Sequence, residues 1–400
     1  MRRLIVIALA ILALGALAGR STRATLPGRV HLGRVPDGGL QPQAVVDNQG
    51  TVHLIYYKGD PGHGDIFYVR SKDWGANFSA PVRVNSQLGS AVALGSIRGA
   101  RLAVGRGGRV YVGWNGSTQA LPKAPLNPVM AGDSPYNGLP MLFTRLNETG
   151  TGFEPQRNLM KETFGLDGGG SVAADSSGNV YVAWHGRRAG DAEGEDGRRV
   201  WIARSDDDGA HFSTEAAAGS DPTGACGCCG LSIFADEHGA VYALYRTATK
   251  TVHRDVDLML STDHGRSFQS RLVDPWTIAA CPMSSMAFAQ GPGFVDMAWQ
   301  TRTEVFYATV EPGTLRISAP VPAPGSGTLR KYPALAANSA GQTLLVWTDG
   351  TGWGKGGSLG WQIFDRSATA QGEEGSAPGL PSWSFGAAFA RPGGDFTILY

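Results

Sequence analysis

The sequence of 400 residues has little charge and little cysteine. Charged residues make up 17% of the chain, with 35 Lys and Arg against 34 Asp and Glu, whereas soluble domains usually carry about 25%. A net charge of +1 excludes the basic surface that proteins use to bind nucleic acid non-specifically, so no nucleic-acid partner is expected. Because 42% of the residues are hydrophobic, the low charge does not indicate disorder.

Long apolar runs are absent beyond the N-terminus. Arg2 and Arg3 precede an apolar run at residues 4–19, and small residues follow up to Ala24. This run is short for a membrane span, and its flanks are typical of a cleavable signal peptide. We therefore expect a signal peptide at 1–24, a mature domain at 25–400, secretion or a periplasmic location, and no stable membrane span.

Glycine, by contrast, is abundant: the chain has 57 glycines, where average usage of about 7% would give roughly half that number. Many of them lie in a repeated pattern of apolar strand, Gly/Asn/Asp turn and second strand ending in an aromatic residue. Period-2 alternation and turn chemistry predict a β-hairpin for each copy. The copies lie at residues 44–57, 102–114, 172–184, 231–245, 286–299, 335–347 and 387–400.

The spacing of these hairpins is about that of four-stranded propeller blades with their loops. Three copies continue into the pattern Ser-x-Asp-x-Gly-x-x-Phe, at residues 71–78, 205–212 and 261–268. This pattern resembles the Asp box (BNR repeat) of the sialidase-like superfamily. The resemblance implies an all-β propeller in which Asp73, Asp207 and Asp263 are structural turn residues. Seven hairpins predict seven blades, with six as the alternative, and a strand near residues 30–35 closing the last blade.

In propellers of this kind, the loops entering first strands and leaving second strands lie on one face, here called the funnel face. The Asp-box turns lie on the opposite face. Arginine's planar fork suits carboxylate, sulfate or phosphate groups, although each arginine could equally pair with a nearby acid. The candidate ligand-binding residues that this rule places on the funnel face are Arg98, Arg101, His185, Arg246, Arg254, Asp255 and Arg302.

The resemblance also implies candidate catalytic residues. Tyr332, before Pro333, is similar to the tyrosine nucleophile of sialidases, and Asp65 lies where an acid/base aspartate is expected. Two features depart from the family. The segment Gln41-Pro42 stands in place of the first substrate-binding arginine, and no glutamate enters the middle blades to activate Tyr332. Whether the chain is an enzyme of the glycoside hydrolase class therefore stays open.

The four cysteines gather before two neighbouring first strands, and an even number in an exported chain predicts disulfides. The residues expected to form them are Cys226, Cys228, Cys229 and Cys281. Two alternatives remain: a soft-metal site that includes Met283, and a redox-active Cys228–Cys229 pair.

We expect a monomer that needs no cofactor or metal and binds, or hydrolyses, anionic carbohydrate or another small anion. The alternative is a non-catalytic scaffold or a metal/redox module built on the cysteines.

Overall fold

The computed structural model describes residues 29–127, 137–219 and 223–400, so the predicted signal peptide at 1–24 lies outside the described residues. The described chain is almost entirely β-strand and turn, with single 3-10 turns at Pro36–Gly38, Arg106–Gly108 and Pro392–Gly394. None of its helices is long and apolar enough to cross a membrane.

The strands of the described residues form seven sheets, which are the blades of a propeller. Blades 1 and 2 contain β2 (Leu40–Val46), β3 (Val52–Asp60), β4 (His63–Ser71), β5 (Val82–Arg83), then β6 (Arg101–Val104), β7 (Val110–Asn115), β8 (Met141–Arg145) and β9 (Arg157–Asn158). Blade 3 contains β11 (Ser171–Ala174), β12 (Val180–Arg188), β13 (Arg199–Ser205) and β14 (Ala216–Ala217), with β10 (Thr163–Phe164) beside β12. Blade 4 contains β15 (Ser232–Ala235), β16 (Val241–Arg246), β17 (Val256–Ser261) and β18 (Gln269–Asp274). Blades 5 and 6 contain β19 (Met286–Gly291), β20 (Phe294–Thr301), β21 (Glu304–Val310), β22 (Val321–Pro322), then β23 (Lys331–Ala337), β24 (Thr343–Asp349), β25 (Gly357–Phe364) and β26 (Ala370–Leu380).

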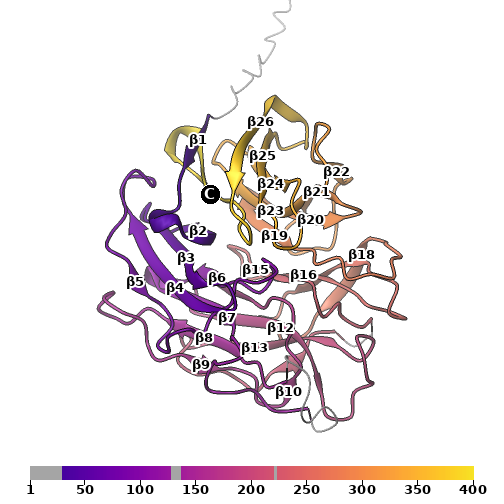
Figure 1. Cartoon of the computed structure of the whole chain (residues 1–400). Helices are drawn as coiled ribbons and strands as arrows, with labels where there is room; N and C mark the ends of the chain where they lie inside the picture. The colour runs from indigo at the N-terminus through magenta and orange to yellow at the C-terminus, as the bar shows by residue number, and fades with distance from the viewer. Residues whose placement is uncertain (1–28, 128–136, 220–222) are drawn as a thin grey trace, which may run out of the picture.

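The seventh blade joins the two ends of the chain. Its strands are β27 (Ala387–Ala390), β28 (Phe396–Leu399) and β1 (Val30–Gly33), and β1 pairs parallel with β28. The first strands of the seven blades contact one another in sequence order, and β27 returns to β2, so the ring of blades is closed (Figure 1). The predictions of seven blades and of closure by an N-terminal strand are confirmed.

The core lies between neighbouring blades, and the aromatic residues that end the second strands fill it. Trp114, Trp184, Trp299 and Trp347 are fully buried. Buried indole N–H groups need acceptors, and those of Trp184, Trp299 and Trp347 donate to Thr163 Oγ1, Asp274 Oδ2 and Asp349 Oδ2 at 2.9–3.0 Å. The aromatic residue of the sequence repeat therefore fills the space between neighbouring blades.

The three Asp boxes form the same hydrogen-bonded turn. In blade 3, Ser205 Oγ donates to Asp207 Oδ1 at 2.7 Å, the amide of Gly209 donates to Ser205 Oγ at 2.9 Å, and the amide of His211 donates to Asp207 Oδ1 at 2.9 Å. The boxes at Asp73 and Asp263 repeat these bonds. The structure thus places Asp73, Asp207 and Asp263 in turns whose partners are a few residues away.

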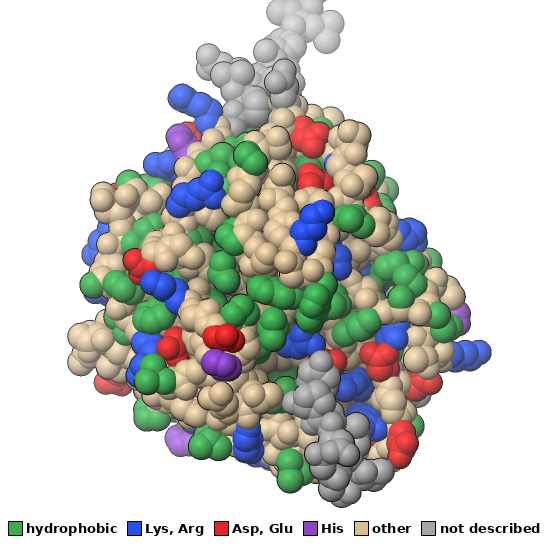
Figure 2. Space-filling view, viewed as in Figure 1, with side chains coloured by type: hydrophobic (Ala, Val, Ile, Leu, Met, Phe, Trp, Pro, Cys, Tyr) green, Lys and Arg blue, Asp and Glu red, His purple; other side chains and the backbone are tan. Residues whose placement is uncertain are grey.

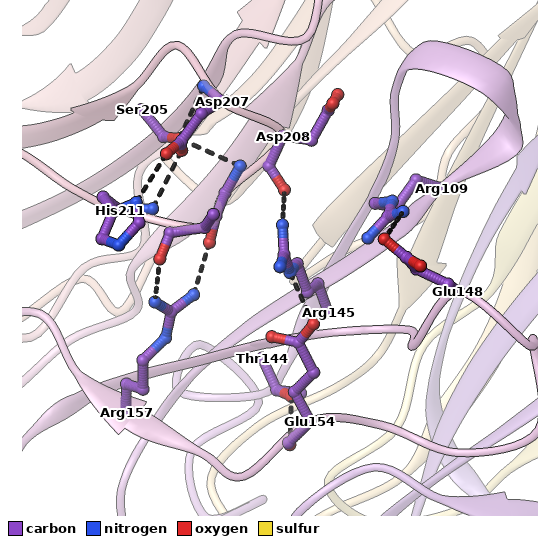
Figure 3. Close-up of polar contacts among 12 residues, drawn as sticks. Arg109, Thr144, Arg145, Glu148, Glu154, Arg157, Ser205, Asp207, Asp208 and His211 are labelled. Atoms are coloured by element: carbon purple, nitrogen blue, oxygen red, sulfur yellow. Dashed lines mark hydrogen bonds and ion pairs between the residues drawn. The ribbon is translucent and has the colours of Figure 1, made fainter.

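An arginine fastens the blade 3 Asp box to blade 2. Arg157 donates to the carbonyl oxygens of Gly209 and Ala210 (Figure 3), and its guanidinium lies 5.4 Å from the ring centre of Phe143. These contacts link the Asp box of blade 3 to the outer strand of blade 2. Figure 2 shows one face of the molecule, on which hydrophobic side chains gather over the middle, with lysine and arginine side chains beside them.

Candidate functional site

The turns that enter the first strands converge at the centre of the funnel face. Four non-glycine residues in them, Gln41, Ser96, Met283 and Tyr332, have positive φ values of 47° to 54°. Such values are uncommon outside glycine and persist only where the surroundings enforce them. At Gln41 and Tyr332 the following residue is a proline, and the strand pairing shifts register there.

A central channel of about 980 Å³ lies along the first strands. The turns that enter these strands lie at the end of the channel that opens on the funnel face. Ile97, Tyr332 and Phe385 form a buried apolar cluster there, with Met283 packed against it. Arg101, the first residue of β6, lines the channel and has no ion-pair partner among residues 29–127, 137–219 and 223–400. Burial lowers the pKa of Arg101 to about 10.

The cysteines lie beside this cluster in the loops before β15 and β19. Cys228 and Cys281 form a disulfide with a Cα–Cα distance of 6.3 Å, which joins blades 4 and 5. Cys226 and Cys229 are buried thiols with their Sγ atoms 2.7 Å apart. Met283 packs against Cys226, Cys228 and Cys229. Of the three connectivities that the sequence allows for two bridges, only the one that pairs Cys226 with Cys229 is compatible with the Cys228–Cys281 bond.

Cationic side chains surround the thiols. Arg246, at the end of β16, donates through Nε to Ser284 Oγ at 2.7 Å, and Ser284 Oγ lies 3.5 Å from Cys229 Sγ. Burial opposes ionisation of Cys229, but the hydrogen bond with Cys226, the charge of Arg246 and the Ser284 hydroxyl together lower its pKa to about 6. The pKa of Cys226 is raised by the same hydrogen bond and by burial. The two thiols therefore titrate as a coupled pair, in which Cys229 is the more readily ionised.

Most of the predicted ligand-binding arginines have partners within the protein. Arg98 pairs with Asp167 at 2.5 Å, and Arg302 pairs with Asp274 at 2.9 Å. Arg254 pairs with Glu195. Fully buried Arg246 donates to the carbonyl oxygens of Arg254 and Gln300. These arginines hold loops together and are not gathered in one open cleft.

His185 and Asp255 also bind neighbouring loops. His185 Nε2 lies 2.7 Å from the carbonyl oxygen of Cys229, which fixes this nitrogen as the donor. Burial lowers the pKa of His185, which favours the neutral ring. Asp255 accepts a hydrogen bond from the amide of Trp276 at 2.7 Å. Both residues support the loops around the cysteines.

Tyr332 and Asp65 contact different neighbours in the structure. Tyr332 belongs to blade 6, is 8% exposed, and packs against Phe385 with ring centres 5.8 Å apart. Burial raises its pKa, although a hydrogen bond with Ser96 opposes the shift. Asp65, in blade 1, accepts hydrogen bonds from Asn85 Nδ2 and the amide of Gly89. Tyr332 is thus engaged with the loops before β27 and β6, and Asp65 with the loop that follows β5.

The sequence analysis missed an exposed aromatic pair. Trp353, between β24 and β25, is 65% exposed and meets Trp383 edge-on with ring centres 4.8 Å apart. A Cβ on Gly95 would lie 3.3 Å from the Trp353 ring, 2.8 Å from Met283 Cε and 2.7 Å from Arg98 Nη1, so the pair adjoins the centre of the funnel face. A tryptophan in a glycine-rich loop leaving a second strand is the signal that could have identified it.

The sequence matches no protein-family model and no curated protein. Solved structures do match. A protein described as of unknown function from Dyadobacter fermentans is 15% identical, with 84% of this chain and 97% of that chain covered and a TM-score of 0.54. An α-L-arabinanase from Penicillium chrysogenum is 12% identical, with 84% and 96% covered and a TM-score of 0.51. A Hadza microbial sialidase is 13% identical, with 78% and 64% covered and a TM-score of 0.49. At these identities the likeness is one of fold, and the predicted β-propeller is confirmed.

Proposed function

We propose that the protein binds an anionic saccharide on the funnel face, with Trp353 as the platform for a sugar ring and Lys355 as the cation for its acidic group. The observation that carries this proposal is the 65% exposure of Trp353 beside Trp383. An exposed pair of indole rings offers a large, rigid apolar surface that a partner can cover. Sugar rings offer a face of C–H groups that fits the negative face of an indole, while their hydroxyls keep their water.

Lys355 belongs to the same turn as Trp353 and is exposed. Thr351 Oγ1 donates to the carbonyl oxygen of Lys355 at 3.1 Å, and Gly352 forms a bridge with Lys355. These bonds hold the backbone of the turn while the ammonium group stays in water. Since Arg98 and Arg254 are buried in ion pairs, Lys355 is the better partner for a carboxylate or sulfate.

The fold supports a sugar ligand in one further respect. The Penicillium chrysogenum propeller is an arabinanase solved with arabinobiose, so a scaffold of this shape can present a saccharide site. Hydrolysis is not part of the proposal, because it needs an acid and a nucleophile or base at the bound sugar. Tyr332 and Asp65 lie in blades 6 and 1 and are engaged with their own neighbours.

Calorimetric titration with acidic and neutral oligosaccharides tests this function. We expect Trp353→Ala to weaken binding at least roughly tenfold, about 1.4 kcal/mol. Lys355→Ala should weaken binding of acidic sugars and leave neutral ones unchanged. Leu272→Ala is the matched control, because Leu272 is a similarly exposed apolar residue on outer strand β18. Undiminished binding by Trp353→Ala, with an unchanged melting temperature, would refute the proposal.

A further inference from the structure

Three sulfur-bearing residues outside the saccharide platform share one buried pocket. Cys226 and Cys229 are fully buried thiols with Sγ atoms 2.7 Å apart. The side chain of Met283 packs against the cluster that these thiols form with Cys228. Met283 has a positive φ of 47°, a strained conformation for this residue.

The Cys228–Cys281 disulfide fixes the two loops that carry these sulfurs. Cys228 is adjacent to Cys229, and Cys281 is two residues before Met283. A bond between Cys228 and Cys281 therefore holds the thiols of blade 4 against the thioether of blade 5. Such preorganisation by a supporting bond is what a metal site needs from the residues around its ligands.

The donor set is soft. Two thiolates and one thioether suit a monovalent soft ion such as Cu(I), whereas hard cations prefer oxygen ligands. A structural zinc site takes four Cys, His or carboxylate ligands. Among the His, Cys, Asp and Glu residues of the described part of the chain, only Cys228 groups with Cys226 and Cys229, and its sulfur is already in a disulfide.

The surroundings supply positive charge for an anionic centre. Two thiolates and one Cu(I) carry a net charge of −1. Arg246 approaches Cys229 through Ser284, and Lys331 donates to the carbonyl oxygens of Pro282 and Met283. Arg254 is buried, and its Nε and Nη1 have no hydrogen-bond partner among the described residues. Its Nη2 is paired with Glu195, so Nε and Nη1 are the donors that a further acceptor could satisfy.

We infer that Cys226, Cys229 and Met283 form a binding site for a soft monovalent metal ion, with Cu(I) as the natural candidate. Binding forms two copper–thiolate bonds and one copper–thioether bond. The thiol protons that remain are released to solvent, and no electron is transferred. The competing state of the pair is a second disulfide between Cys226 and Cys229, which would remove both thiolates.

Thiol counting and metal analysis on the exported chain, purified without reductant, separate these two states. We expect two cysteine thiols per chain after denaturation with a chelator, and one equivalent of Cu(I) taken up in anaerobic competition with a colorimetric Cu(I) chelator. X-ray absorption should show a coordination shell of sulfur only. Zero thiols together with zero copper would overturn the inference, because all four cysteines would then be in disulfides.

Variants test each ligand. Cys226→Ser and Cys229→Ser should each abolish uptake of Cu(I), and Met283→Leu should weaken it roughly tenfold, as loss of a supporting group does at metal sites. Met160→Leu is the control, since Met160 is buried in the core between blades 2 and 3. Met283→Leu keeps the core volume and both thiols, so it stays informative if a cysteine variant does not fold. Unchanged uptake by Met283→Leu and Cys229→Ser would also overturn the site.

Discussion

The charged side chains on the two faces of the propeller have different kinds of partner. On the Asp-box face, exposed carboxylates are held by partners within four residues, such as Asp73 with Asn77. On the funnel face, buried arginines are held by partners far along the chain: Arg98 by Asp167, 69 residues away, and Arg254 by Glu195, 59 residues away. The Asp-box carboxylates are held by local turns and these funnel-face arginines by bonds between blades, so the same kind of substitution should have unequal effects.

The largest effect is expected from Arg246→Ala. Arg246 is fully buried and bonds Ser284, Thr301 and two backbone carbonyls. Its loss leaves buried acceptors without donors and a cavity, which should lower the free energy of unfolding by more than about 3 kcal/mol. Urea unfolding measures this, with Arg246→Lys, which keeps the charge, as the comparison. A loss below about 1 kcal/mol would mean that water replaces the guanidinium, and the contrast between the faces would fail.

The second largest loss of stability is expected from removal of the disulfide that joins blades 4 and 5. The double substitution Cys228→Ala/Cys281→Ala opens a link between residues 53 apart. Because the bridge restricts the unfolded chain, its loss should lower stability by about 2–5 kcal/mol. Thermal unfolding with and without reductant checks this. The reductant should lower the melting temperature of the wild-type chain and leave that of the double variant unchanged.

A smaller effect is expected from Asp207→Ala on the Asp-box face. The carboxylate accepts hydrogen bonds from Ser205 and His211 but is partly exposed, so its loss should cost about 1 kcal/mol. Thermal unfolding compares it with Asp206→Ala, the neighbouring acid in the same turn, which should be near neutral. An effect of Asp207→Ala as large as that of Arg246→Ala would remove the distinction between the two faces.

The smallest expected effect is the contribution of Asp73 to the pH dependence of stability. Hydrogen bonds from Asn77 and Ser71 lower the pKa of Asp73 to about 2 from an ordinary 3.8. A lowered folded pKa stabilises the fold above the unfolded value, and this contribution is lost as pH falls from about 4 to about 2. Urea midpoints across this range should fall less steeply in Asp73→Asn than in the wild-type chain. Identical slopes would show that Asp73 does not contribute.

The fold and the funnel-face chemistry differ in how far the sequence predicts them. The seven hairpins, the Asp boxes and the closing strand at Val30–Gly33 follow from patterns within a few tens of residues, and the structure has each of them. The sequence also places Arg98, Arg246 and Arg254 on the funnel face. It does not show that they are engaged with Asp167, Ser284 and Glu195, because these pairs join loops of different strands and blades.

Trp353 shows the same limit from the other direction. The glycine-rich segment around Trp353 predicts a loop. Whether the indole in that loop is buried or exposed depends on Trp383 and Gly95, which come from other loops of the ring. The proposed saccharide platform could therefore be found only after the loops were assembled.

The sequence by itself determined the repeat, the turn chemistry and the number of blades, since these depend on hydrogen bonds and alternation between residues close in the chain. The tertiary structure decided which cysteines are bonded, which arginines are occupied and which aromatic residue meets solvent. Each of these depends on the distance between loops that only the closed ring brings together, as Cys228 and Cys281 do across blades 4 and 5.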